Sequence, residues 1–327
     1  MSSTSRTATA RAHPNLALVK YWGKRDEALM LPATGSLSLT LDVFPTTTTV
    51  TLDPGLAADR LELGGHPVDG EPLRRVQRFL DLVRERAGSD EHAHVRSRNT
   101  VPTGAGLASS ASGFAALAAA ASAVWDLPQD TAGLSRLARR GSGSAARSVV
   151  PGIAVWHAGH DDLSSFAEQL DGPPLAMVVA VIDGGPKAVS SREAMRRTAA
   201  TSPFHTAWIS STTATLADMV AACRTGDVPR IGELAELNAL RMHALIQSCD
   251  PPIRYLAPAS IAVFDRVAAL RSEGVGAWAT ADAGPNVAVV CAPADAALVA
   301  RALEDLAQVH VAHPGPGVEL VADEVVV

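Results

Sequence analysis

A glycine- and serine-rich stretch at residues 102–112 has the composition of a loop that binds phosphate. Glycine tolerates backbone conformations that other residues avoid, so consecutive amide N–H groups can converge there on one anion. Apolar residues at helical spacing follow and predict a helix from about Gly106 to Trp125. The positive end of that helix and the hydroxyls of Ser109 and Ser110 would face the phosphate. The spacing matches neither the Walker A motif nor the dinucleotide-binding glycine motif, so an alanine-rich core helix is the alternative interpretation.

Three other short segments carry groups that could do chemistry. Residues 20–26 read Lys-Tyr-Trp-Gly-Lys-Arg-Asp, which predicts either a solvated loop or an anion-binding loop. Residues 140–148 place arginines on both sides of a second glycine- and serine-rich turn, and a flexible linker is the alternative. Near the C-terminus, Asp282 precedes Ala-Gly-Pro at a strand end, where an Asx turn is the alternative. The sequence alone leaves both interpretations of each segment open.

The hydrophobic pattern predicts an alternation of strands and helices that would position these segments. The predicted strands are at residues 12–19, 37–43, 46–52, 93–97, 153–157, 176–181, 277–280 and 287–291. The predicted helices are at residues 73–86, 106–125, 131–140, 203–224, 228–247, 260–272 and 293–308. The polar first twelve residues predict a frayed tail, and residues 318–321 predict an edge strand or a tail. A Gly-Gly-Pro-Lys segment at 184–187 predicts a boundary between domains 1–183 and 184–327.

The composition excludes several classes of protein. The chain has 327 residues, of which 47% are hydrophobic and 19% charged, which predicts two globular domains rather than disorder. A net charge of −6 argues against non-specific binding to nucleic acid or to an anionic membrane. The three cysteines form no C-x-x-C pair, so neither a disulfide framework nor a zinc site is indicated. With no signal-peptide pattern and no long apolar run, the expected location is the reducing cytoplasm.

Taken together, the motifs resemble those of a known enzyme family. The pattern P-x-x-x-G-L-A-S-S-A, beginning at Pro102, resembles the phosphate-binding motif of the GHMP small-molecule kinase superfamily, which includes galactokinase, homoserine kinase and mevalonate kinase. The segments at 20–26, 140–148, 190–195 and 282–286 are together similar to one branch, the mevalonate diphosphate decarboxylases. These five motifs in the family's order span nearly the whole chain, which makes the resemblance far more specific than any single loop.

The resemblance implies both a fold and a reaction. The fold would be α+β with two domains, an N-terminal half like ribosomal protein S5 domain 2 and a ferredoxin-like C-terminal half, with the active site between them. The reaction would use ATP and Mg²⁺ to phosphorylate the tertiary 3-hydroxyl of (R)-mevalonate 5-diphosphate. Phosphate and CO₂ would then leave, giving isopentenyl diphosphate and ADP. The family also implies a homodimer with a small phosphorylated substrate as its partner.

The family's motifs also assign roles to residues of this sequence. Asp282 would be the general base, Lys20 would orient it, and Arg147 would grip the substrate carboxylate in a bidentate manner. The substrate's phosphates and carboxylate would be bound by Asn15, Tyr21, Lys24, Ser142, Ser144 and Arg192. ATP would be bound by Pro102, Gly104, Ala105, Gly106, Leu107, Ala108, Ser109 and Ser110. Either Ser109 or Ser110 would be the candidate Mg²⁺ ligand.

Three positions depart from the family pattern. Residues 33–36 lack the usual pair of serines, residues 149–152 lack an aromatic residue followed by Gly-Gly, and Ala281 replaces an aromatic residue before the aspartate. These positions lie near the expected substrate wall, so they leave the exact substrate open.

Three alternative functions follow. The first is a decarboxylase of mevalonate 5-phosphate or another 3-hydroxy acid, the second a kinase that stops at the 3-phosphate, and the third a ligand-sensing pseudo-enzyme. The presence of Asp282, Lys20 and Arg147 together counts against the last two.

Overall fold

The computed structural model describes residues 6–100, 109–182 and 188–322, with only the backbone of Ser109. The first strands are β1 (Arg6–Ala12), β2 (Asn15–Val19), β3 (Lys24–Asp26), β4 (Leu31–Pro32), β5 (Ser36–Thr40), β6 (Thr46–Leu52), β7 (Arg60–Leu63), β8 (His66–Pro67) and β9 (Ala93–Asn99). The later strands are β10 (Ile153–Trp156), β11 (Ala167–Gln169), β12 (Ala176–Val181), β13 (Ala277–Thr280), β14 (Val287–Cys291), β15 (Gln308–Ala312) and β16 (Glu319–Val321). The helices are α1 (Glu71–Ala87), α2 (Ser109–Val124), α3 (Thr131–Gly141), α4 (Ala145–Ser148), α5 (Ser191–Thr201), α6 (His205–Thr225), α7 (Val228–Gln247), α8 (Pro258–Ser272) and α9 (Ala296–Leu303).

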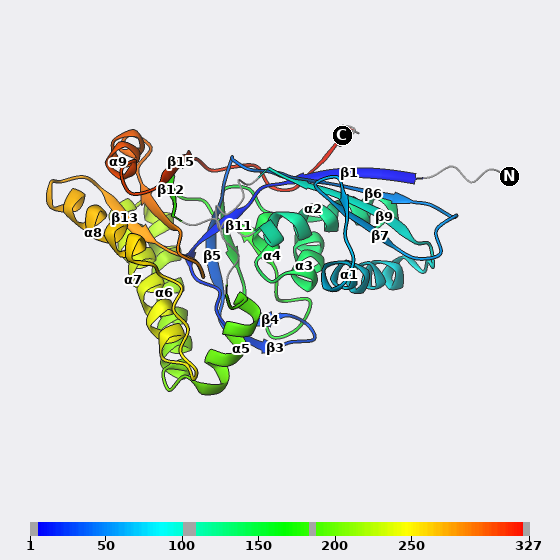
Figure 1. Ribbon diagram of the computed structural model, residues 1–327, viewed down its shortest axis with the longest axis horizontal. Helices are drawn as coiled ribbons and strands as arrows, with labels where there is room; N and C mark the ends of the chain where they lie inside the picture. The colour runs from blue at the N-terminus through cyan, green and yellow to red at the C-terminus, as the bar shows by residue number, and fades with distance from the viewer. Residues whose placement is uncertain (1–5, 101–108, 183–187, 323–327) are drawn as a thin grey trace.

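The first half of the molecule is a six-stranded sheet covered on one face by helices (Figure 1). Its strand order is β16-β1-β6-β9-β7-β8, and α1, α2 and α3 lie along one side of it. Helix α2 packs directly on β1 and β6, and all of its alanines except Ala123 are buried, so the helix axis approaches the sheet closely. A helix that is apolar all round belongs in a protein interior, so the start of α2 is held by a rigid core.

Two further sheets contain four strands each and share one apolar core. Their strand orders are β11-β10-β5-β2 and β13-β14-β12-β15. Helix α7 packs against both β2 and β13, and one apolar core contains side chains of both sheets together with α6 and α7. Lys20 follows β2 and Asp282 lies two residues after β13. The shared helix therefore brings two strand ends together that are more than 200 residues apart in the sequence.

The predicted frayed tail is wrong for residues 6–12, which form β1 inside the six-stranded sheet. β1 pairs antiparallel with β6 and with β16. The threonine hydroxyls of its Thr-Ala alternation bond across to β6, with Thr9 Oγ1 2.9 Å from Thr49 Oγ1. Its alanines face the core. The run reads as polar, yet this alternation suits a half-buried strand.

One other prediction needs adjustment near the C-terminal end. The helix predicted at 293–308 is shorter, since α9 ends at Leu303 and Gln308 begins β15. The predicted boundary at 183/184 lies outside the described residues. It stays a prediction; β12, which precedes it, pairs with β14 and β15, and β16 pairs with β1 in the first sheet. The predicted α+β class of the fold is confirmed.

Candidate active site

Lys20 and Asp282 form an ion pair where the ends of β2 and β13 lie close together. The Lys20 Nζ lies 2.7 Å from Asp282 Oδ1 and also donates to the carbonyl of Ala17 at 2.7 Å. The lysine side chain is 1% exposed, whereas the aspartate side chain is 37% exposed. Burial lowers the pKa of Lys20, and the Asp282 charge opposes that shift. The carboxylate is thus reachable from outside while its cation is fixed behind it.

Arg147 is a buried cation whose hydrogen-bond partners among the described residues are all neutral. Its Nε and Nη2 donate to Asn15 Oδ1 at 3.2 and 3.1 Å, and its Nη1 donates to Ser36 Oγ at 2.5 Å. The Asn15 amide in turn donates to Ser148 Oγ and to the carbonyl of Ser144. In the part of the chain that the structure describes, no carboxylate lies within ion-pair distance of this guanidinium.

Burial lowers the pKa of Arg147 to about 10, and the nearby Asp282 charge opposes this shift. A fully buried guanidinium without a carboxylate partner is costly for folding, and a bound anion would neutralise it. The electrostatics around Arg147 therefore favour a site for a negatively charged ligand beside Asp282.

Other predicted substrate-binding residues surround this pair. The Tyr21 hydroxyl is buried and has no hydrogen-bond partner among the described residues. Its ring lies 4.9 Å from that of Trp156, and burial raises its pKa. A Cβ on Gly143 would come within 2.7 Å of the Tyr21 hydroxyl, so only glycine allows this turn to approach the ring. The buried hydroxyl is thus available to a ligand at this point.

Lys24 and Arg192 contribute positive charge next to Tyr21. Arg192 lies in the first turn of α5, and its charge lowers the pKa values of Tyr21 and Lys24, which places it near both. The Lys24 ammonium is 2.9 Å from the Glu27 carboxylate, and its side chain is 4% exposed. Although the protein carries a net negative charge, cations are concentrated here, as binding of a polyanion requires.

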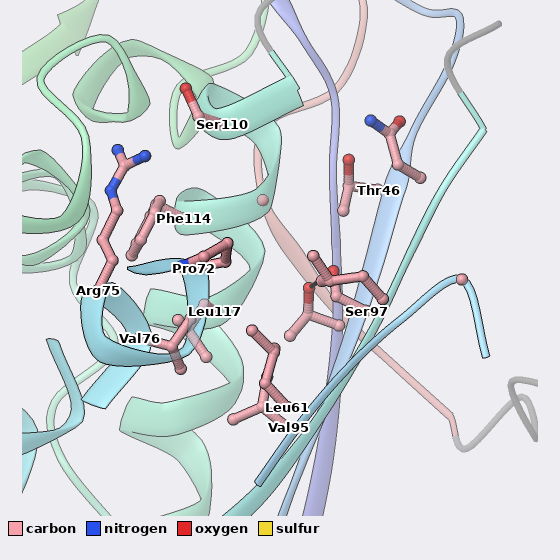
Figure 2. A pocket seen from close by; sticks show the side chains of 15 residues that line it. Thr46, Leu61, Pro72, Arg75, Val76, Val95, Ser97, Ser110, Phe114 and Leu117 are labelled. Carbon is pink, nitrogen blue, oxygen red and sulfur yellow. Dashed lines mark hydrogen bonds between the residues drawn. The ribbon is translucent and has the colours of Figure 1, made fainter. Parts of the chain in front are cut away.

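A cavity of about 340 Å³ lies beside the start of α2 (Figure 2). Its walls come from α1, α2, β6, β7 and β9, and they are mostly apolar. Leu61, Val95 and Leu117 line its interior, and Ser110 lies at one end. Gly113 also faces it, and a side chain there would enter open space. An apolar cavity with a few polar groups at its edge is typical of a small-molecule site.

Arg75 connects this cavity to the second glycine-rich turn. Its guanidinium lies over the Phe114 ring, 4.6 Å from the centroid, and donates to the carbonyl of Gly141 at 2.8 Å. Burial and, to a smaller extent, the Arg192 charge lower its pKa to about 10. The Ser142 hydroxyl, one residue along that turn, lies 3.3 Å from Ser110 Oγ. The cavity therefore adjoins the positively charged site that contains Lys24 and Arg192.

The remaining predicted positions differ in how far the structure places them. Six of the residues predicted to bind ATP lie outside the described residues: Pro102, Gly104, Ala105, Gly106, Leu107 and Ala108. The structure brings together Lys20, Arg147 and Asp282 with Asn15. The sequence interpretation missed Ser36 and Ser148 as partners of the Arg147–Asn15 network, although both lie inside segments singled out for other reasons.

Metal ligands and membrane spans can be assessed over the described ranges. Over these ranges, no three His, Cys, Asp or Glu side chains gather into a group that could hold a metal ion. A helix long and apolar enough to cross a bilayer is also absent from residues 6–100, 109–182 and 188–322.

Two family models cover most of the chain. The diphosphomevalonate decarboxylase-like N-terminal domain matches residues 12–167, and the mevalonate 5-diphosphate decarboxylase C-terminal domain matches residues 177–315. The diphosphomevalonate decarboxylase of Ganoderma lucidum is 38% identical, over 86% of this chain and 77% of its own length. The phosphomevalonate decarboxylase of Haloferax volcanii is 35% identical, over 86% of each chain.

Solved structures match over nearly the full length. The mevalonate diphosphate decarboxylase from Staphylococcus aureus is 40% identical with a TM-score of 0.94, and covers 98% of this chain and 99% of its own. A structure of MDDEF in complex with MVAPP, AMPPCP and magnesium is 43% identical with a TM-score of 0.93, and covers 97% of this chain and 99% of its own.

Proposed function

The chain belongs to the diphosphomevalonate decarboxylase family, and we propose that it converts (R)-mevalonate 5-diphosphate and ATP to isopentenyl diphosphate, ADP, phosphate and CO₂. The observation that carries this proposal is the pairing of two charged groups in one site. A partly exposed carboxylate held by Lys20 lies near the buried guanidinium of Arg147, which has no carboxylate within ion-pair distance among the described residues. The first suits removal of a proton and the second suits binding of a carboxylate.

In the first step, Asp282 accepts the proton of the substrate's tertiary 3-hydroxyl. The hydroxyl oxygen attacks the γ-phosphorus of ATP, and the bond from that phosphorus to ADP breaks. Lys20 holds the Asp282 carboxylate through its 2.7 Å contact, so the base keeps its orientation as the proton moves. Positioning of this kind accounts for most of the catalysis in phosphoryl transfer.

In the second step, phosphate leaves C3 with the electrons of the C–O bond, and positive charge develops on C3. The C1–C2 bond then breaks, its electrons form the C2–C3 double bond, and CO₂ departs. Arg147 would hold the carboxylate so that the breaking bond lines up with the electron-poor centre. Asn15 and Ser36 fix the plane of the guanidinium for this purpose.

ATP would occupy the apolar cavity beside α2, whose apolar walls suit a nucleotide base and whose polar edge at the start of α2 suits phosphates. Arg75 and Ser110 lie at the edge of the cavity and would contact the phosphates. Mg²⁺ is held mainly by phosphate oxygens and water in such sites, with few protein ligands. Of the two serines predicted as Mg²⁺ ligands, Ser110 is the one whose side chain the structure describes. Mg²⁺ would neutralise charge on the phosphates.

The finer assignments are also proposals. Tyr21, Lys24, Ser142, Ser144 and Arg192 would bind the substrate's diphosphate. The free and buried thiols of the three cysteines suit a reducing cytoplasm. The proposal that the protein forms a homodimer rests on the family resemblance.

A comparison of two substrates distinguishes this function from that of a mevalonate 5-phosphate decarboxylase. We expect mevalonate 5-diphosphate to give a kcat/KM at least about tenfold above that of mevalonate 5-phosphate, because the lost phosphate removes charge-assisted hydrogen bonds. CO₂ release would be measured with each substrate at matched ionic strength, since the two differ in charge. Equal or faster turnover of the monophosphate would overturn the assignment.

A further inference from the structure

Helix α7 carries two polar side chains on its buried face. The face is otherwise apolar and follows the helical repeat, with Ile231, Leu234, Ala235, Ala239 and Met242 buried. Asn238 is 0% exposed and His243 is 2% exposed. Burying an amide or an imidazole costs free energy unless it gains hydrogen bonds. The hydrogen-bond partners of Asn238 therefore indicate what that residue does.

Asn238 holds the backbone of the catalytic lysine. Its Oδ1 accepts from the Lys20 backbone N–H at 2.7 Å, and its Nδ2 donates to Thr212 Oγ1 at 3.2 Å. The backbone N–H can only donate, so the oxygen of the amide must face Lys20. This contact joins α7 to Lys20, which directly follows β2 in the sheet β11-β10-β5-β2.

The same helix holds the strand that leads to Asp282. Glu236 accepts from the Ala279 N–H at 2.7 Å, and it pairs with Arg271, which donates to the carbonyl of Ala277 at 2.8 Å. These side chains bond to β13, which is an edge strand of its sheet.

His243 is buried on the same face of α7. Burial lowers its pKa to about 4 and the Lys20 charge acts in the same direction, while the backbone of Ala281 and the Asp282 charge oppose the shift. Its Nε2 has no hydrogen-bond partner among the described residues. A neutral imidazole adds no second positive charge beside Lys20.

We propose that α7 sets the geometry of the Lys20–Asp282 pair, with Asn238 as the positioning residue for Lys20. This inference rests on the proposed function and deepens it. Asn238 holds one member of the pair, while Glu236 holds the strand that leads to the other. Because small misplacements of catalytic groups cause large losses of rate, the helix acts as a fixed spacer between base and cation.

Asn238→Ala tests the proposal by separating kcat from KM. We expect kcat to fall about 10²-fold, while the KM values for ATP and mevalonate 5-diphosphate stay within about threefold, because the buried amide would touch neither ligand. Thr212→Val removes only the hydroxyl that orients the amide, so it should lower kcat about threefold to tenfold with the same pattern.

Leu234→Ala is the matched control, since Leu234 lies on the same buried face but cannot hydrogen-bond to either catalytic residue. It should lose stability and keep kcat within about threefold of wild type. An Asn238→Ala enzyme with kcat in that range, or with its loss confined to KM, overturns the proposal. If Asn238→Ala does not fold, an unchanged kcat in Thr212→Val overturns it. Absence of CO₂ release by the wild-type enzyme would instead reject the proposed function.

Discussion

Asp282→Asn is expected to lower kcat at least about 10³-fold while ATP and mevalonate 5-diphosphate still bind. The amide keeps the size of the carboxylate and an oxygen for Lys20, but it cannot accept the proton of a tertiary alcohol. Phosphoryl transfer therefore fails, and decarboxylation cannot follow. Steady-state kcat measures the loss, and calorimetric titration of each ligand measures the binding that remains.

Asp295→Asn makes the same change of charge away from the site and provides the control. Asp295 stands at the N-terminal end of α9 and makes no capping hydrogen bond through its side chain. Its variant should turn over like wild type. A near-normal kcat in Asp282→Asn would remove Asp282 from the mechanism.

Arg147→Gln is expected to lower kcat at least about 10²-fold and to leave the KM for ATP unchanged. The glutamine amide cannot hold a carboxylate with two parallel charge-assisted hydrogen bonds. The melting temperature should stay within about 5 °C of wild type, because removal of a buried charge with no described ion-pair partner offsets the lost bonds to Asn15 and Ser36. Kinetics and thermal unfolding of the same preparation check both expectations.

Arg140→Gln is the matched control for this variant, since Arg140 flanks the other side of the same turn and its side chain is 18% exposed. It should retain wild-type kcat. If the effect of Arg147→Gln is confined to the KM for ATP, the guanidinium belongs to the nucleotide site instead.

The sequence predicted the family and much of the fold because the evidence for both is local. Each motif is a short run, and helix α7 was predicted with the bounds that the structure gives it. Lys20, Arg147 and Asp282 were selected through their motifs. Their proximity depends on how β2 and β13 pack against α7, which no local pattern contains. Their catalytic roles stay predictions.

Other features could not be predicted because their parts are ordinary in isolation. The residues of β1 read as a polar tail, and only pairing with β6 and β16 explains them. The cavity beside α2 collects apolar residues from five elements, none of which is unusual in its own segment. A signal for Asn238 was present, because a polar residue lies on a buried apolar helical face, but its partner Lys20 is 218 positions away.

The ratio of CO₂ to ADP tests the central claim most directly. Wild-type enzyme would be incubated with Mg²⁺, limiting ATP and an excess of (R)-mevalonate 5-diphosphate, and both products would be counted at completion. Coupled phosphorylation and decarboxylation predict one CO₂ for each ADP. ADP that accumulates without CO₂ would contradict the account and would identify a kinase that stops at the 3-phosphate.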